Sequence, residues 1–398
     1  MKKIILALGC GLFFYGCQQL MRDVVQVQKV DQTFLTDQLT VLAQKAKKDI
    51  QSYPIDSTRF PRSLEADKSI HATASRSWTS GFYPGTLWYL YAFSDDAELK
   101  EAAATWTDYV EKEKWDTHTH DLGFKLNCSH GLAYEMTGEV AYKDVVVTAS
   151  NTLIKRYNPN VGAIRSWDFN KENWDFPVII DNMMNLEMLF EATEMTGDSI
   201  YHNIAHQHAL TTLDNHFRDD YSTYHVIDYN PETGAVRKRN THQGNSDDSA
   251  WSRGQAWGLY GYAMSYGKTK DKRFLKQAEA IADYFFTHER MPKDLIPYWD
   301  FDAPDIPNEP RDVSAATIAA SALIELADYV PAKREQYLEW ADTILLSLSQ
   351  DSYQTKAVPF FLNQSVGNKP GNSEINTPLV YADYYYVEAL RRRLKSLS

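Results

Sequence analysis

The 398-residue chain has few cysteines, an excess of acidic over basic side chains, and few long apolar runs. Its 41 lysines and arginines stand against 53 aspartates and glutamates, which gives a formal net charge of −12. This balance argues against a nucleic-acid partner, because phosphate contacts need clustered Lys and Arg side chains. After the first twenty residues no apolar run reaches the length of a membrane-spanning helix. We therefore expect contact with a membrane only through the N-terminus.

The first residues are typical of a bacterial lipoprotein signal. Lys2 and Lys3 precede an apolar run that ends at Gly16-Cys17. We predict a signal peptide over 1–16, a lipid anchor on Cys17 after cleavage, and an N-terminal tether over 17–32. The protein would then be a periplasmic or outer-membrane-anchored lipoprotein.

The three cysteines also restrict how the mature chain is stabilised. Cys10 has too little apolar sequence before it to be the acylated residue, and cleavage before Cys17 leaves Cys128 as the one free thiol. No disulfide can therefore form within the mature chain, even in an oxidising compartment. We expect stability to come from packing, in a monomer or weak oligomer.

Helical periodicity dominates the chain, and strand-like alternation is scarce. A junction recurs in which a helix ends in a turn with Gly or Asp and an amphipathic helix rich in Ala follows. It occurs at 90–96, 134–139, 192–198, 262–271 and 323–330. With helices near 34–53 and 380–394, these hairpins predict about twelve helices in one all-α catalytic domain, 33–398, built as an (α/α)6 barrel with function in long loops at one end. A plain helical-repeat scaffold is the alternative.

The stretch 174–190 contains Asp181 between an apolar loop and a predicted helix. Pro177 and three β-branched residues precede this carboxyl group. Burial in such a setting raises a carboxyl pKa and can produce a proton donor. The alternative is that Asp181 serves only as a helix N-cap.

The stretch 77–88 holds Trp78 ahead of Gly81, Pro84 and Gly85, at the start of a predicted helix. The two glycines allow close backbone approach, and an exposed Trp ring would offer an apolar face to a sugar. The alternative is a Trp buried under a tight turn.

The stretch 116–124 is rich in His and Asp, but it has neither a Cys pair nor an HExxH helix, so we predict no metal and no other cofactor. We expect an exposed loop ending at Asp121, with Gly123 allowing a sharp turn. Asp121 is then a candidate second carboxylate beside Asp181, as glycoside hydrolysis typically requires.

The stretch 228–257 contains Arg253 and Trp257, which are four residues apart and would share one face of a helix. We expect this pair to clamp one ligand, in a polar pocket with His225 and Gln243. The alternative is an Arg–Trp packing pair at the surface.

The stretch 361–370 combines Ser365, Gly367 and Lys369 in a loop able to bind an anion such as sulfate. An ordinary turn is the alternative.

Four of these stretches, in this order, resemble the unsaturated glucuronyl hydrolases, glycoside hydrolase family 88. They are Trp-Thr-Ser-Gly-Phe-Tyr-Pro-Gly (78–85), His-Asp-Leu-Gly-Phe (120–124), Asp-Asn-Met-Met-Asn-Leu (181–186) and Trp-Ser-Arg-Gly-Gln-Ala-Trp (251–257). The family fold is an (α/α)6 barrel. The resemblance implies hydrolysis of lyase-generated oligosaccharides, most of all those from glycosaminoglycans, whose non-reducing end is a 4,5-unsaturated uronic acid.

The resemblance also implies roles for particular residues. Asp181 would protonate C4 of the double bond while water adds at C5, and Asp121 would hold the sugar hydroxyls. The pocket positions that match the family are Trp78, His120, Trp167, His225, Gln243, Arg253 and Trp257. The alternatives are an unsaturated rhamnogalacturonyl-type hydrolase, which shares the barrel and an Asp pair, and a non-catalytic glycan-binding lipoprotein.

Overall fold

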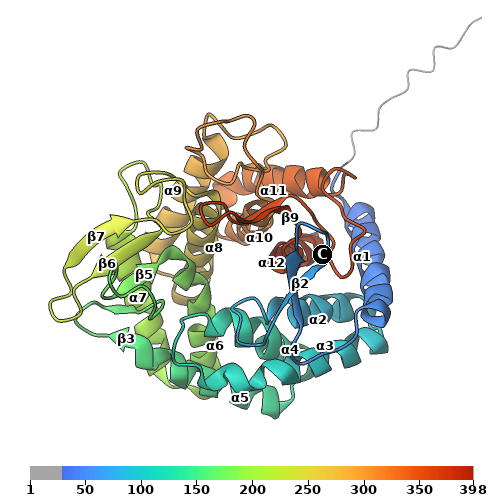
Figure 1. The fold of residues 1–398 in the computed structure, drawn as a ribbon, viewed down its shortest axis with the longest axis horizontal. Helices are drawn as coiled ribbons and strands as arrows, with labels where there is room; N and C mark the ends of the chain where they lie inside the picture. Colours follow the sequence, from blue (N-terminus) through green and yellow to red (C-terminus); the bar gives the residue numbers. More distant parts are fainter. Residues whose placement is uncertain (1–28, 398) are drawn as a thin grey trace, which may run out of the picture.

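The computed structural model describes residues 29–397, so the predicted signal peptide and Cys17 lie outside the described part. Twelve α-helices of this part form a ring of six inner and six outer helices, which Figure 1 shows from one end. The outer helices are α1 (Gln32–Ser52), α3 (Ala97–Val110), α5 (Val140–Leu153), α7 (Ser199–Asn215), α9 (Lys272–Thr287) and α11 (Arg334–Leu348). The inner helices are α2 (Phe82–Ser94), α4 (Leu132–Thr137), α6 (Leu186–Thr196), α8 (Ser252–Thr269), α10 (Val313–Tyr329) and α12 (Val380–Lys395). The predicted (α/α)6 barrel is confirmed.

The predicted hairpin junctions lie between α2 and α3, α4 and α5, α6 and α7, α8 and α9, and α10 and α11. Gly138 and Gly197 end α4 and α6 in the left-handed conformation (φ +71° and +77°) that favours glycine. Asp96, Asp198 and Asp271 then cap the next helix by accepting hydrogen bonds from its first N–H groups. Local sequence therefore accounts for four of these short turns, whereas the turn between α10 and α11 contains the 3-10 helix Pro331–Lys333 instead.

The inner helices pack closely because they carry small side chains. Helix α10 is rich in Ala and Ser, and it lies against α8, α11 and α12 with nearly every residue buried. Outer helices bury one face only; in α9 that face is Phe274, Ala278, Ile281, Ala282 and Phe285. Among residues 29–397, no helix combines the length and the apolar character needed to cross a membrane.

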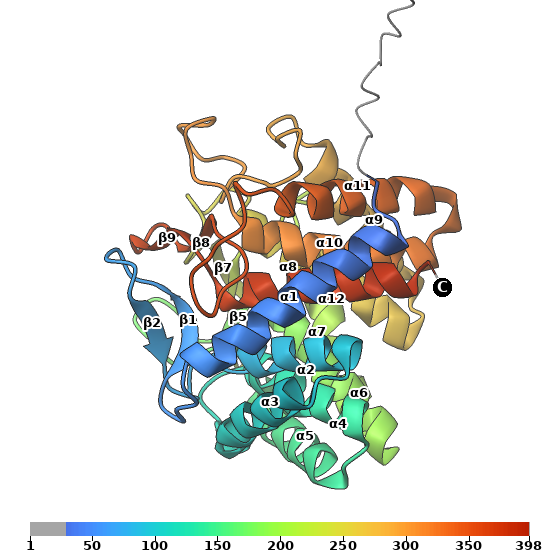
Figure 2. The same ribbon diagram turned by 90° about the vertical axis from the view of Figure 1, so that its right-hand side faces the viewer.

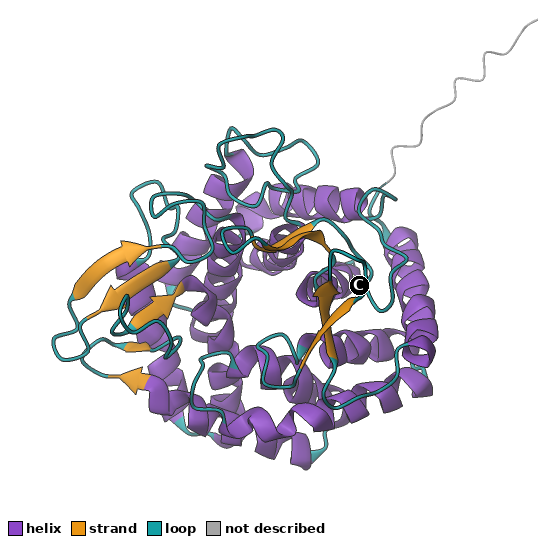
Figure 3. Ribbon diagram, in the orientation of Figure 1, coloured by secondary structure: helices purple, strands orange, loops and turns teal. Residues whose placement is uncertain are grey.

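At the end of the barrel opposite the short turns, the connections carry all the strands of residues 29–397 (Figures 2 and 3). Strands β1 (Phe60–Leu64) and β2 (Ile70–Thr73), β3 (Tyr157–Asn158) and β4 (Ala163–Ile164), and β8 (Ser365–Asn368) and β9 (Ser373–Thr377) form antiparallel pairs. Strands β5 (Pro177–Ile179), β6 (Val226–Tyr229) and β7 (Val236–Asn240) form an antiparallel sheet of three. Short 3-10 helices occur at Glu111–Trp115, Ile154–Arg156 and Pro331–Lys333. The long connections thus gather at one end, as predicted.

Two further inner segments precede α4 and α6. A π-helix, η2 (Gly123–Gly131), runs into α4, and a 3-10 helix, η4 (Ile180–Asn185), runs into α6. A π-helix is rare and is found mostly at functional sites. Gly123 does not make the sharp turn that we expected: it begins η2, and a β-carbon there would meet the backbone of Asn185 at 2.7 Å. Its role is to let η2 approach η4.

Helix α8 approaches η4 just as closely. A β-carbon at Gly261 would lie 2.4 Å from Cβ of Met183, whereas one at Gly258, a turn earlier on α8, would find ordinary contacts from 3.4 Å outward. The absence of a side chain at Gly261 therefore sets the position of η4.

We expect Gly261→Ala to lower the free energy of unfolding by about 1–3 kcal/mol, because the added methyl group overpacks the contact with Met183. Gly258→Ala is the matched control on the same helix. It should leave stability unchanged or raise it by up to about 1 kcal/mol, through the better helix propensity of alanine. Urea unfolding of both variants measures the difference, and equal stabilities would contradict the proposed contact.

Candidate active site

Asp181 lies in the first turn of η4, where the chain leaves strand β5. The N–H of Ile180 donates to the carbonyl of His225 (3.1 Å), and the side chain of Asn182 donates to the carbonyl of Ile164 (2.9 Å). These bonds fix the start of η4. The N-cap of this helix is Ile179, not Asp181. The N-cap interpretation of Asp181 is therefore wrong.

The carboxyl group of Asp181 is nearly enclosed, with 13% of its side chain exposed. Its Oδ2 atom has no hydrogen-bond partner among the described residues. Burial raises the pKa of Asp181 to about 6, although the charges of His120 and Arg253 act in the opposite direction. The predicted burial of Asp181 and the upward direction of its pKa shift are therefore present, although the surrounding groups include His225, His120 and Arg253.

His225 faces Asp181 from the end of β6, with its Nε2 atom 3.7 Å from Oδ2 of Asp181. The main-chain N–H groups of His242 and Gln243 donate to its Nδ1 atom at 3.1 and 3.0 Å. Burial, followed by nearby positive charges, holds the pKa of His225 well below its usual range, so the ring is neutral. Because Nδ1 accepts these bonds, the proton of the neutral ring is on Nε2, and this N–H points toward Asp181.

Asp121 lies between the loop that ends at His120 and the π-helix η2. Its carboxylate accepts a hydrogen bond from the hydroxyl of Thr119 (2.5 Å), and its Oδ1 atom lies 3.1 Å from Nε2 of His120. Burial alone would raise the pKa of Asp121, but the charge and hydrogen bond of His120 together with Thr119 lower it overall. The expected exposed loop is wrong for its last residues, because the His120 side chain is only 3% exposed and that of Asp121 20%.

A hydrogen bond joins the segment that carries Asp121 to the segment that carries Asp181. The N–H of Phe124, three residues after Asp121, donates to the side-chain oxygen of Asn185 at the end of η4 (3.0 Å). The charge of Asp121 also contributes to the raised pKa of Asp181. The structure thus combines one carboxyl group whose pKa is raised with a second whose pKa is lowered, which is the usual division between an acid and its partner.

Arg253 is buried at the start of α8, and its partners are not those we expected. Its guanidinium donates to Asp312 Oδ2 (2.9 Å), to the carbonyl of Val366, and to the carbonyl of Gly367 (2.6 Å). It lies 4.5 Å from the centre of the Trp251 ring. The predicted clamp of Arg253 with Trp257 is therefore wrong: Arg253 pairs with Trp251 and ties α8 to β8.

Trp257 is fully buried between Phe124 (5.2 Å between ring centres) and Tyr385 (5.6 Å). Through Phe124, its ring packs against the segment that follows Asp121. Trp78 packs on Phe124 (5.3 Å) and Tyr381 (4.9 Å) and remains partly exposed. Gly81 and Gly85 allow the predicted close approach, since β-carbons there would meet the carbonyl oxygens of Phe124 and Cys128.

Trp167 forms an isolated antiparallel β-bridge with Thr119, two residues before Asp121. It stacks on Phe169 (4.9 Å, 18° between planes) and packs on Trp174 (5.3 Å) and His242 (5.6 Å). Gln243 links two loops: besides its main-chain bond to His225, its side chain donates to the carbonyl of Gly367 (3.0 Å). Both residues therefore lie around the acids, as predicted.

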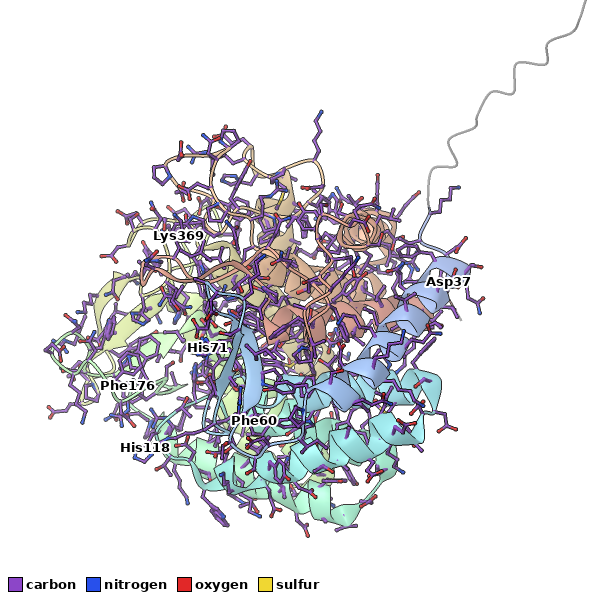
Figure 4. The ribbon with its side chains drawn as sticks, turned by 45° about the vertical axis from the view of Figure 1, so that its right-hand side comes forward. Asp37, Phe60, His71, His118, Phe176 and Lys369 are labelled. Atoms are coloured by element: carbon purple, nitrogen blue, oxygen red, sulfur yellow. The ribbon has the colours of Figure 1, made fainter. Side chains whose placement is uncertain are left out.

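Ser365 and Lys369 do not form the predicted anion-binding turn. Ser365 is fully buried in strand β8, and Lys369 Nζ lies 3.5 Å from Oε2 of Glu309, over the ring of Trp299. Figure 4 shows Lys369 at the strand-bearing end of the molecule, on which His118 and Phe176 also lie. The sequence predicted a loop here, but residues 365–368 form strand β8, which pairs with β9.

Sequence reasoning missed Asp312 and Tyr381. Asp312 caps α10 by accepting a hydrogen bond from the N–H of Ser314 (3.0 Å), and this local Asp-x-Ser signal could have been recognised. Its pairing with Arg253 could not, because the two residues are 59 positions apart. Within residues 29–397, no cluster of three or more His, Cys, Asp or Glu side chains is arranged to hold a metal ion.

Two neighbouring carboxyl groups with opposite pKa shifts beside tryptophan rings, at the loop end of an α/α barrel, are typical of a carbohydrate-active enzyme. The chain is 46% identical over 397 residues to an unsaturated glucuronyl hydrolase of Formosa agariphila, covering 98% of each chain. It is 34% identical over 328 residues to an unsaturated chondroitin disaccharide hydrolase of Streptococcus agalactiae, covering 80% of this chain and 81% of the relative.

A solved structure of an unsaturated glucuronyl hydrolase specific for heparin matches with a TM-score of 0.88 and 45% identity, over 92% of this chain and 98% of that chain. No model of a protein family matches the chain. The chain belongs to the unsaturated glucuronyl hydrolases, and it is an enzyme of that family.

The two carboxyl groups should affect stability with opposite pH dependence. The folded pKa of Asp181, about 6, exceeds the unfolded value of about 3.9, so Asp181 disfavours folding increasingly as pH rises through this window. The stability of Asp181→Asn relative to wild type should therefore rise by about 1–3 kcal/mol between pH 4 and pH 8.

Asp121→Asn is the matched control, because the pKa of Asp121 is lowered. The wild-type carboxylate contributes stability above the unfolded pKa and loses it as pH falls through the folded pKa. This variant should therefore lose stability relative to wild type as pH rises from about 2 to about 5. Urea unfolding at several pH values measures both curves, and slopes of the same sign would contradict the assigned protonation states.

Proposed function

We propose that the enzyme removes the 4,5-unsaturated uronic acid from the non-reducing end of lyase-generated oligosaccharides, with Asp181 as general acid and base. The observation that supports this role is the opposite pKa shift of two neighbouring carboxyl groups, Asp181 upward and Asp121 downward. A proton donor must hold its proton at working pH, and a pKa near 6 allows this in mildly acidic solution.

In the proposed reaction Asp181 gives its proton to C4 of the C4=C5 vinyl ether, and water adds its oxygen to C5. The proton released by that water returns to Asp181, so the residue is regenerated. The product is a hemiketal at C5, which opens and breaks the bond to the neighbouring sugar. No nucleophile at the anomeric carbon is required, so a single carboxyl group can serve both proton transfers.

The other residues have positioning roles in this proposal. Asp121, held ionised by His120 and Thr119, accepts hydrogen bonds from the sugar hydroxyls. The Nε2 proton of His225 is available to a polar group of the substrate beside Asp181, because this nitrogen has no partner among the described residues. Trp78 and Trp167 offer aromatic faces to the sugar rings.

We propose disaccharides from glycosaminoglycans as the substrates. The relatives named above act on unsaturated disaccharides of chondroitin and on heparin, and this chain is similar to both. The rhamnogalacturonyl alternative has no comparable support in these matches. Membership of an enzyme family rules out the alternative of a non-catalytic glycan-binding protein.

Incubation with unsaturated disaccharides of chondroitin, hyaluronan and heparin should abolish their near-ultraviolet absorbance, because hydration removes the double bond. Asp181→Asn should lower kcat/KM by about a hundredfold or more, the usual contribution of a general acid. Glu101→Gln, on the exposed face of α3, is the control and should be fully active. No absorbance loss with any of the three substrates, or full activity of Asp181→Asn, would refute the assignment.

We also propose that Cys17 carries a lipid and anchors the enzyme in a bacterial membrane, on the support of the residues around it alone. Expressed from the full chain, the protein should appear in the membrane fraction and take up radiolabelled palmitate. Cys17→Ser should abolish labelling and release the protein, while Cys10→Ser should change neither. Labelling that persists in Cys17→Ser would contradict the anchor.

A further inference from the structure

A cavity of about 550 Å³ enters the barrel from the end opposite the catalytic loops. The second halves of α6 and α12 line it, and Figure 2 shows α12 running from the strand-bearing end toward the C-terminus. Glu135, Glu194 and Lys395 are exposed at its mouth, and Phe124 and Tyr385 are buried at its floor. Asp121, Asp181 and His225 do not line this cavity, so it is distinct from the site around the two aspartates.

Two carboxyl groups of α6 line the cavity, and neither pairs directly with a basic side chain of residues 29–397, although the charges of Arg392 and Lys268 act on them. Glu187 and Glu191 are one helical turn apart on the same face, and neither has an ion pair among the described residues. Both of these cations are already engaged: Arg392 pairs with Glu325 (2.7 Å) and Glu388 (3.5 Å), and Lys268 pairs with Glu194 (3.0 Å). Two like charges at this spacing disfavour each other unless a cation lies between them.

The rest of the wall is aromatic. The rings of Tyr89, Tyr260, Tyr384 and Tyr385 line the same cavity. The side chain of Tyr385 is only 2% exposed, yet its hydroxyl has no hydrogen-bond partner among the described residues. This is a buried polar group at the floor of a cavity, and such groups normally have a partner.

We propose that this cavity binds a small organic ammonium ion. Its charge lies between Glu187 and Glu191, its carbon skeleton lies against the tyrosine rings, and the hydroxyl of Tyr385 takes up its polar end. Carboxylates combined with aromatic faces are the usual means by which proteins hold organic cations. The volume falls within the range of small-molecule sites.

The protonation of the pair supports this proposal. Burial, followed by the charge of Glu191, raises the pKa of Glu187, and burial raises the pKa of Glu191. The other charged groups around the pair are Glu135, Glu194, Lys268, Glu325, Glu388, Arg391, Arg392 and Lys395. A bound cation favours the ionised carboxylates, so binding releases protons and strengthens as pH rises through the raised pKa values.

Titration calorimetry of the full chain with 1,4-diaminobutane, with 1,4-butanediol as the uncharged control, tests the site. We expect saturable binding of the diamine with a dissociation constant below about 1 mM at pH 8.5, at least tenfold weaker binding at pH 6, and no binding of the diol. Thermal unfolding should shift upward with the diamine alone.

The double variant Glu187→Gln and Glu191→Gln should bind the diamine at least tenfold more weakly, and Tyr385→Phe severalfold more weakly. The double variant should remain folded, because it removes a repulsion. Glu335→Gln with Glu339→Gln, an exposed pair at the same spacing on α11, is the matched control and should bind like wild type. No saturable binding, or equal binding by the Glu187 and Glu191 variant, would overturn the proposal. Because no sugar substrate is used, neither result depends on the catalytic assignment.

Discussion

The site depends on the desolvation of the Asp181 carboxyl group. This desolvation arises because η4 packs closely against its neighbours. Gly261 of α8 and Gly123 of η2 have no side chains where they meet η4, so η4 can lie close to both. That closeness excludes water from Asp181 and raises its pKa to about 6. The same packing that builds the barrel therefore sets the protonation state of the acid.

The polar residues around Asp181 act mainly on each other. Thr119 and His120 keep Asp121 ionised, while two main-chain N–H groups fix the proton of neutral His225 on Nε2. Arg253 binds Asp312 and two carbonyl groups of strand β8, so it ties α8 to the connections before α10 and α12. Such buried, satisfied bonds hold side chains in a fixed geometry, which proton transfer to a carbon atom requires.

The barrel divides into two ends with different chemistry. At the loop end, two carboxyl groups with opposite pKa shifts lie beside the partly exposed ring of Trp78 and the buried ring of Trp167. At the end of short turns, a tyrosine-lined cavity holds two carboxyl groups whose pKa values are both raised. Phe124 and the π-helix that begins at Gly123 contact both regions, so a ligand in the cavity would lie directly behind the segment that carries Asp121.

The sequence by itself determined the helical hairpins and indicated Asp181 as the proposed acid. Turn residues such as Gly138 and caps such as Asp198 act on neighbouring backbone atoms, so the hairpins can be predicted from local patterns, and the apolar residues before Asp181 already indicate a raised pKa. Only the tertiary structure decided that Arg253 pairs with Asp312, that Trp257 is fully buried, and that Ser365 lies in a strand. These outcomes depend on contacts between residues far apart in the chain, which the barrel brings together and which no local pattern specifies.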